Sequence, residues 1–160
     1  MMAMHTWFEC KIRYEKTMEN GMQKKVTEPY LVDALSFTEA EARIIEEMTP
    51  FITGEFTVSD IKRANYSELF PSDEESADRW FKCKLIFITL DEKSGAEKKT
   101  STQVLVQAAD LRDAVKKLDE GMKGTMADYQ IGMVSETPLM DVYPYSAEPN
   151  DKPEFDPSKA

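Results

Sequence analysis

Apolar and polar residues alternate over Trp7–Tyr14, and almost the same series of residues returns at Trp80–Phe87. In both stretches every second residue is apolar or a cysteine, which is the pattern of a β-strand with one buried face. Such self-similarity at a fixed spacing is typical of a chain built from repeated structural units. The chain therefore contains a duplicated unit, and both copies are expected to use the same elements.

The agreement between the copies extends through a glycine-containing turn and a second strand to an amphipathic helix. Ser36 and Asp110 occupy equivalent N-cap positions, each followed three residues later by an acidic residue. An apolar stripe at steps of three and four follows in each copy, and Leu69-Phe70-Pro71 is echoed by Val142-Tyr143-Pro144. The predicted strands cover Thr6–Lys16, Lys24–Leu35, Glu55–Ala64, Trp80–Leu90, Lys98–Ala108 and Asp128–Ser135, and the predicted helices cover Phe37–Met48 and Leu111–Met122.

This order predicts an α+β protein made of two tandem β-β-α-β repeats that pack as a pseudo-twofold pair. Each repeat alone would be a marginal domain, because a small sheet with one helix buries only one of its faces. The predicted divisions are a first repeat at 1–71, an acidic linker at 72–79, a second repeat at 80–145 and a proline-rich, acidic, disordered tail at 146–160.

The chain has 41% hydrophobic residues and a formal net charge of -10. This composition is typical of a globular protein with a buried core, and the negative charge argues against the broad basic surface of a duplex-DNA binder. There is no apolar run long enough to cross a bilayer and no secretory signal pattern at the N-terminus, so we expect no membrane contact and a cytoplasmic location.

The two cysteines, Cys10 and Cys83, occupy equivalent positions on the apolar face of the repeated strand. We expect them to be buried free thiols, because a cytoplasmic setting disfavours a disulfide. With His5 as the single histidine, the chain lacks the spacing of a zinc site, so no metal is predicted.

The opposite face of the repeated strand combines tryptophan with basic residues. One interpretation is that the tryptophans pack between the repeats, or between the subunits of a homo-oligomer. The other is a platform on which bases of a single-stranded nucleic acid or a nucleotide stack, with the cations neutralising phosphates. The candidate ligand-binding residues are Trp7, Lys11, Arg13, Trp80, Lys82 and Lys84.

Sequence motifs for catalysis are missing: the chain has no phosphate-binding loop, no dinucleotide fingerprint and no hydrolase elbow. No catalytic residue and no cofactor are therefore predicted. We expect a non-enzymatic binding or regulatory module with an unknown protein partner. A further alternative is an acidic decoy, in which the Asp73–Asp78 run occupies a nucleic-acid-binding protein.

Three segments carry a family resemblance: His5–Lys11, Trp80–Lys84 and Met140–Pro144. The sequence of these segments resembles an uncharacterised family, a domain of unknown function that occurs in gut anaerobic bacteria and their phages. The resemblance covers about Met4 to Tyr145. The resemblance implies a compact intracellular protein of phage or mobile-element origin. It implies no activity, cofactor or catalytic residue.

Overall fold

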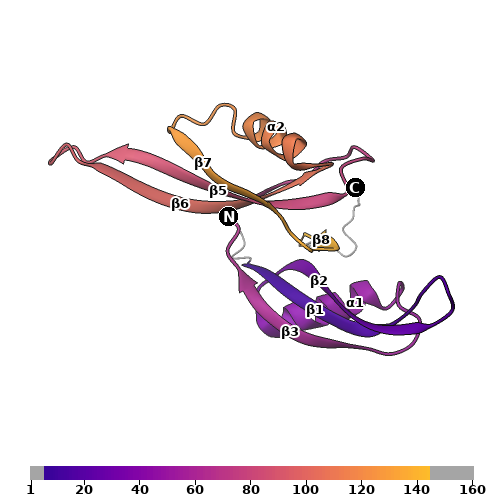
Figure 1. The fold of residues 1–160 in the computed structure, drawn as a ribbon. Coiled ribbons are helices and arrows are strands. Elements are labelled where there is room, and N and C mark those ends of the chain that lie inside the picture. Colours follow the sequence, from indigo (N-terminus) through magenta and orange to yellow (C-terminus); the bar gives the residue numbers. More distant parts are fainter. Residues whose placement is uncertain (1–5, 145–160) are drawn as a thin grey trace, which may run out of the picture. The chain divides into compact units, whose positions relative to one another are not determined.

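The computed structural model describes residues 6–144, and within this range the chain is a mixed α+β protein with two helices and eight strands in two sheets (Figure 1). A β-β-α-β-β order of elements runs through the chain twice. The elements are β1 (Thr6–Thr17), β2 (Gln23–Ala34), α1 (Phe37–Met48), β3 (Phe56–Ala64), β4 (Glu68–Phe70), β5 (Arg79–Leu90), β6 (Glu97–Ala108), α2 (Leu111–Gly121), β7 (Tyr129–Glu136) and β8 (Asp141–Tyr143).

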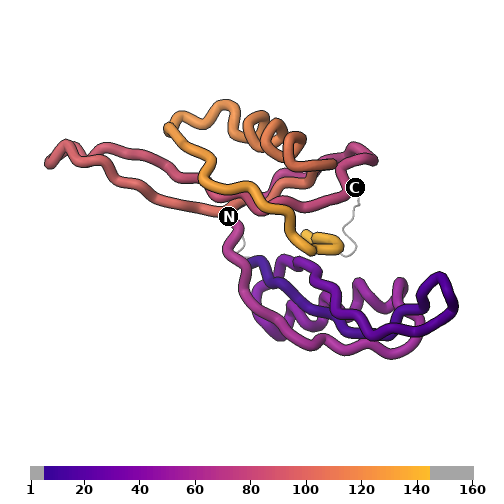
Figure 2. The backbone as a smooth tube through the Cα atoms, in the orientation of Figure 1, coloured from indigo at the N-terminus to yellow at the C-terminus, as the bar shows by residue number. Residues whose placement is uncertain are grey.

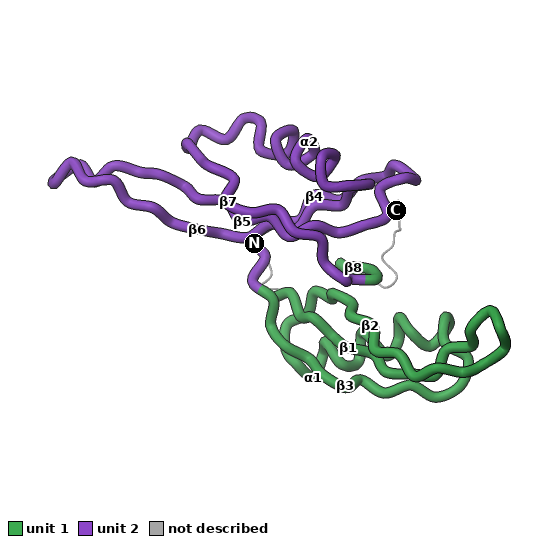
Figure 3. The backbone as a smooth tube through the Cα atoms, in the orientation of Figure 1, with its two compact units in different colours: residues 1–64, 140–160 green, residues 65–139 purple. Residues whose placement is uncertain are grey.

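The chain forms two compact units (Figure 3). Within the described residues, the first unit comprises 6–64 together with 140–144, and the second comprises Asn65–Leu139. The strand order is β3-β1-β2-β8 in the sheet of the first unit and β4-β6-β5-β7 in the sheet of the second. The packing of the two halves as a pseudo-twofold pair stays a prediction.

A short parallel strand completes each sheet, and it comes from the other half of the sequence. β8, at the end of the second β-β-α-β-β series, pairs with Tyr30–Val32 of β2. β4, at the end of the first series, pairs with Val104–Val106 of β6. The predicted repeat had three strands and did not contain this exchange of a fourth strand.

Each sheet is built on a long antiparallel hairpin. β1 pairs with β2 from Thr6 opposite Ala34 to Thr17 opposite Gln23, and β5 pairs with β6 in the corresponding register. On its other side β5 pairs with β7, and this pairing ends at Phe87. The remainder of the β5–β6 hairpin consequently extends away from α2 and β7, as Figure 2 shows.

Both helices begin at the predicted caps. The Ser36 hydroxyl accepts a hydrogen bond from the backbone N–H of Glu39 at 3.1 Å, and the Asp110 carboxylate accepts one from Asp113 at 2.8 Å. The acidic third residue reaches back in each case, since Glu39 accepts from the N–H of Leu35 and Asp113 from that of Ala109. Both helices therefore begin with a variant of the capping box: the cap side chain satisfies one donor of the first turn, and the acidic third residue accepts from the N–H just before the cap.

Each helix covers one face of its own sheet and encloses a separate core. Ala40, Ile44 and Met48 of α1 pack on a cluster that contains Phe8, Cys10 and Ile12 of β1. Ala114, Leu118 and Met122, in and just after α2, pack on the equivalent residues of β5, which are Phe81, Cys83 and Leu85. The predicted apolar stripes are confirmed, except that the first members, Phe37 and Leu111, are largely exposed.

The same irregularity interrupts both sheets. The pairing of β1 with β3 shifts by one residue between Lys11 and Ile12, and that of β5 with β7 shifts between Lys84 and Leu85. Such β-bulges bend a strand and re-aim its side chains, and they occur often beside functional sites. In both units the bulge lies next to a candidate lysine.

Among residues 6–144, no helix is both long enough and apolar enough to span a bilayer.

The core beneath α2 yields a stability prediction. Replacing the fully buried Leu118 with alanine should lower the free energy of unfolding by about 2–5 kcal/mol, because it removes buried apolar contacts and leaves a cavity. Leu111→Ala on the same helix is the matched control, and since Leu111 is 52% exposed it should change stability by less than about 0.5 kcal/mol. Urea unfolding of both variants measures the difference, and equal effects would contradict the assigned core.

Candidate functional site

The first three candidate residues lie along β1 on the face opposite α1. Trp7 and Lys11 are half-buried, whereas Arg13 is exposed. Their cross-strand neighbours on β3 are Ala64, Asp60 and Thr57, respectively. The predicted common face is therefore confirmed, and the cations on it alternate with carboxylates, because Glu9 lies between Trp7 and Lys11 and Asp60 lies opposite Lys11.

The other three candidates lie along β5, again on the face away from the helix. Trp80 is buried, with 6% of its surface exposed, while Lys82 is half-buried and Lys84 is exposed. The lysines have no acidic cross-strand neighbour, since they lie opposite Leu105, Ser135, Gln103 and Met133. Because Trp80 is enclosed, Trp7 is the better placed of the two tryptophans to stack on a base.

A cavity of about 650 Å³ lies in the first unit, where β1, β2 and the loop before β3 meet. Arg13 lines it, so one sequence-predicted candidate borders a real depression in the surface. The charged lining residues are Arg13, Glu15, Lys25 and Glu55, and the aromatic ones are Tyr14 and Phe56. The predicted residues Trp7, Lys11, Trp80, Lys82 and Lys84 are not part of this lining.

Beside the cavity, a buried carboxylate joins two strands. Glu28 of β2 is only 9% exposed and accepts hydrogen bonds from the hydroxyls of Tyr14 at 2.9 Å and Tyr30 at 3.3 Å. Lys16 approaches the other carboxylate oxygen at 3.7 Å. Burial and the bond to Glu28 raise the pKa of Tyr14 to about 12, and burial also raises the pKa of Tyr30. Glu28 thus fixes the side chain of Tyr14, a residue that lines the cavity.

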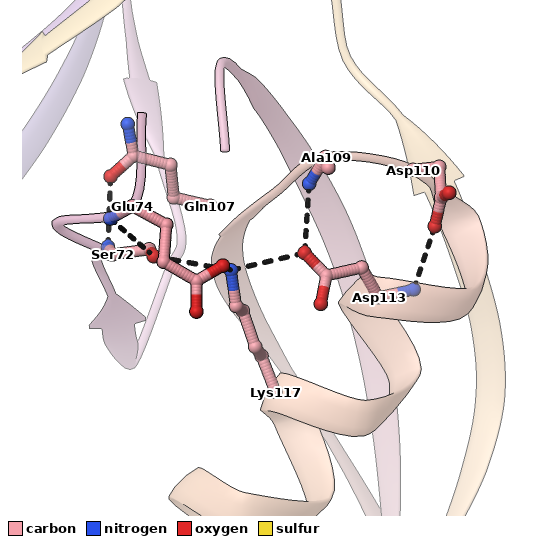
Figure 4. A network of polar contacts seen from close by, with 7 residues as sticks. All are labelled: Ser72, Glu74, Gln107, Ala109, Asp110, Asp113 and Lys117. Carbon is pink, nitrogen blue, oxygen red and sulfur yellow. Dashed lines mark hydrogen bonds and ion pairs between the residues drawn. The ribbon is translucent and has the colours of Figure 1, made fainter. Parts of the chain in front are cut away.

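In the second unit, a polar network ties the acidic segment before β5 to α2 (Figure 4). The Lys117 ammonium contacts Glu74, Asp113 and the Ser72 hydroxyl at 3.0, 3.0 and 3.1 Å. Burial alone would lower the pKa of Lys117, but the hydrogen bonds to Asp113 and Glu74 raise it. Part of the acidic run is therefore occupied within the unit, and its role as a decoy stays a prediction.

Both thiols are enclosed in the cores. Cys10 and Cys83 are fully buried and free, as the alternation predicted. Burial raises the pKa of Cys10 to about 12 and that of Cys83 to about 11. A thiol is nucleophilic as its thiolate, so neither residue is placed to act as a nucleophile.

No group of histidine, cysteine and carboxylate side chains suited to a metal ion occurs within 6–144. The one histidine, His5, lies outside the described residues.

Comparison with known proteins gives a family. A family model described as "Domain of unknown function (DUF4494)" matches residues 6–145. The chain belongs to the DUF4494 family. This agrees with the resemblance to an uncharacterised family. No curated protein and no solved structure matches this DUF4494 chain.

Sequence reasoning missed the other residues around the cavity, although some signals were present. Glu28 falls at a helix-facing position in the alternation of β2, among Val26, Tyr30 and Val32, so a buried acid with partners was foreseeable. Glu55 and Phe56 reach the cavity only because the loop after α1 returns to the end of β1. That proximity depends on tertiary structure and has no local signature.

The buried thiols yield a reactivity prediction. In the native protein at about pH 8, neither Cys10 nor Cys83 should react with a thiol-specific chromogenic reagent on the timescale of minutes, because both are enclosed and protonated. Two thiols per chain should react once urea unfolds it. Rapid modification of either thiol in the folded protein would show that its core is open.

The tyrosines beside Glu28 predict a loss of stability at alkaline pH. The folded pKa of Tyr14, about 12, exceeds its ordinary value of 10.0, so its contribution is complete below about pH 10 and is lost as pH rises toward 12. Tyr14→Phe should therefore show a shallower fall in unfolding free energy over this range than the unmodified chain. Urea titrations across the range test this, and identical slopes would mean that Tyr14 ionises normally in the folded state.

Proposed function

We propose that this protein is a non-enzymatic binding module whose first unit binds a nucleotide or a short single-stranded nucleic acid at the cavity beside Arg13. The observation that carries the proposal is the lining: two basic, two acidic and two aromatic residues line one depression of about 650 Å³. This volume lies within the usual range of small-molecule sites.

The charged residues suit different parts of such a ligand. Arg13 and Lys25 are exposed cations, and an arginine can form paired hydrogen bonds with a phosphate. Glu15 and Glu55 accept hydrogen bonds and fit the exocyclic amino group of a base. Glu15 and Lys25 lie directly opposite each other in the β1–β2 pair, yet within the described residues they form no ion pair with each other. Both remain available to a ligand.

The aromatic walls supply a surface for a base. Tyr14 and Phe56 are cross-strand neighbours on β1 and β3, and each is partly exposed. Stacking of a base on an aromatic ring contributes about 1–3 kcal/mol and tolerates any base. The bond from Tyr14 to Glu28 limits the motion of one ring and reduces the ordering cost on binding.

The second unit lacks the same combination of charges. The positions equivalent to Arg13 and Glu15 of β1 are Ile86 and Ile88 of β5. The change of two charged residues to isoleucine supports a ligand site that belongs to the first unit. The phage or mobile-element setting and the cytoplasmic location are part of the same proposal and rest on the sequence resemblance and composition.

Binding of a fluorescently labelled single-stranded oligonucleotide, followed by anisotropy, tests the proposal. Affinity should weaken as salt is raised, because phosphate contacts release counterions. Arg13→Ala should reduce affinity about tenfold or more, in line with the loss of a charge-assisted hydrogen bond. Nucleoside monophosphates should compete with the oligonucleotide.

Arg112→Ala is the matched control, since Arg112 is an exposed arginine on α2 of the other unit. It should leave the affinity unchanged. Glu55→Gln should alter the preference between bases with and without an amino group while leaving the salt dependence in place. Absence of binding, or an equal loss of affinity in the two arginine variants, would refute the proposal.

A further inference from the structure

The two short parallel strands share a sequence pattern. β4 and the residue after it read Glu68-Leu69-Phe70-Pro71, and β8 and the residue after it read Asp141-Val142-Tyr143-Pro144. Both segments are an acidic residue, an aliphatic residue, an aromatic residue and a proline. Each pairs with three residues in the C-terminal half of a long strand, at equivalent places.

The residue just before each short strand forms a backbone hydrogen bond to the long strand, at equivalent positions. The N–H of Met140, just before β8, donates to the carbonyl of Pro29 at 2.9 Å. The N–H of Ser67, just before β4, donates to the carbonyl of Gln103 at 2.8 Å. Both acceptors immediately precede the three-residue ladder, so each segment enters its sheet in the same register.

The aromatic residue is held on the helix side in both units. Tyr143 packs against the core beneath α1 and stacks on Tyr30, with ring centroids 6.2 Å apart. Phe70 packs against the core beneath α2, where a Cβ at Gly121 would come within 2.8 Å of its ring. The aliphatic residue points to the other face, where Val142 is buried.

A cation on the helix fastens the exit from each short strand. Arg43 of α1 donates to the carbonyls of Asp33 and Pro144. Lys117 of α2, at the equivalent helical position, donates to the Ser72 hydroxyl, and the N–H of Ser72 donates to Gln107. Proline has no N–H and cannot extend the ladder, so the chain leaves the sheet at the proline, next to the helix cation.

The covalent connection differs between the units although the recognition is the same. In the second unit, β4 belongs to the continuous stretch Asn65–Leu139 that forms the whole unit. In the first unit, β8 follows that stretch in the sequence and is separated by it from the rest of the unit. We name the receiving residues Tyr30–Val32 and Arg43 the β2 edge site. The edge of β2 receives the four-residue pattern from a segment later in the chain, and the edge of β6 receives it from a segment earlier in the chain. Equivalent edges therefore hold the same pattern through opposite connections, which points to recognition of the segment itself.

We propose that the β2 edge site is a peptide-recognition site for the pattern acidic–aliphatic–aromatic–proline, and that the Asp141–Pro144 segment of a second copy of this chain can occupy it in place of the chain's own. The exchanged contacts would be identical, so the choice between the two states depends on the connecting chain. Pro138 and Leu139 are the residues between Thr137, which bonds to Trp80, and Met140, which bonds to Pro29. A tethered segment has an effective concentration in the millimolar range, so the unmodified chain should be monomeric at micromolar concentration.

Deleting Pro138 and Leu139 tests the proposal by preventing the segment from reaching its own unit. Light scattering after gel filtration should then give a dimer at micromolar concentration. The same deletion combined with Tyr143→Ala should give a monomer, because the aromatic contact is lost in every copy. A peptide spanning Leu139–Pro144 should convert the dimer into monomers, whereas a scrambled peptide should not. A monomeric deletion variant, or an assembly that the peptide leaves unchanged, would overturn the proposal.

A second measurement keeps the full-length chain and does not depend on the deletion. The labelled Leu139–Pro144 peptide should bind the Tyr143→Ala chain at least about tenfold more tightly than the unmodified chain, because its intramolecular competitor is weakened. A peptide spanning Ser67–Ser72 should compete for the same site. Arg43→Met, introduced into the Tyr143→Ala chain, should weaken this binding, and Arg112→Ala should not. Equal binding of the scrambled peptide, or no binding of either matching peptide, would exclude sequence recognition at this edge.

Discussion

The buried Leu31–Val32 segment of β2 must find hydrogen-bond partners on its outer edge, and the rest of the first unit depends on how it does so. Leu31 and Val32 are fully buried, as are Leu105 and Val106 at the equivalent place in β6. A buried backbone N–H or carbonyl without a partner costs about as much as a lost hydrogen bond. A free edge is tolerable in water, but these segments are removed from it. The three-residue strands β8 and β4 meet this requirement, and each closes the sheet that the other half of the sequence has built.

The constraint explains why such short strands are present at all. Three residues of parallel ladder contribute little alone, and both segments add an aromatic ring on the helix side and a fastening contact from Arg43 or Lys117. The helix, the edge and the returning strand therefore form one arrangement that occurs twice. In the first unit it links the beginning of the described chain to its end, because β8 joins β2 across more than a hundred residues of sequence.

Much of this architecture was predictable from the sequence. The alternation over Trp7–Tyr14 and Trp80–Phe87 located β1 and β5, and the caps at Ser36 and Asp110 located both helix starts, because these signals are local. The short strands were not predicted, since three residues carry no periodicity. The similarity of Leu69-Phe70-Pro71 and Val142-Tyr143-Pro144 was visible, but two segments with the same pattern cannot reveal which sheet each one joins.

The candidate site was predictable only in part, and the reason lies in how the two units differ. The common face of Trp7, Lys11 and Arg13 follows from alternation, whereas the enclosure of Trp80 depends on tertiary contacts. Around Glu28 the first unit is polar, and the equivalents of Tyr14, Glu28 and Tyr30 in the second unit are Phe87, Thr102 and Val104. A buried carboxylate is costly unless its hydrogen-bond partners are present, and the first unit has these partners while the second has no carboxylate there. This difference supports distinct roles for two units with the same framework.

Nuclear Overhauser effects between backbone protons of the short strands and the long ones would show whether strands are exchanged between the two halves. Strand exchange predicts cross-peaks that join Asp141–Tyr143 to Tyr30–Val32 and Glu68–Phe70 to Val104–Val106, in parallel register. Cross-peaks joining Glu68–Phe70 to Tyr30–Val32, with each half closing its own sheet, would contradict it.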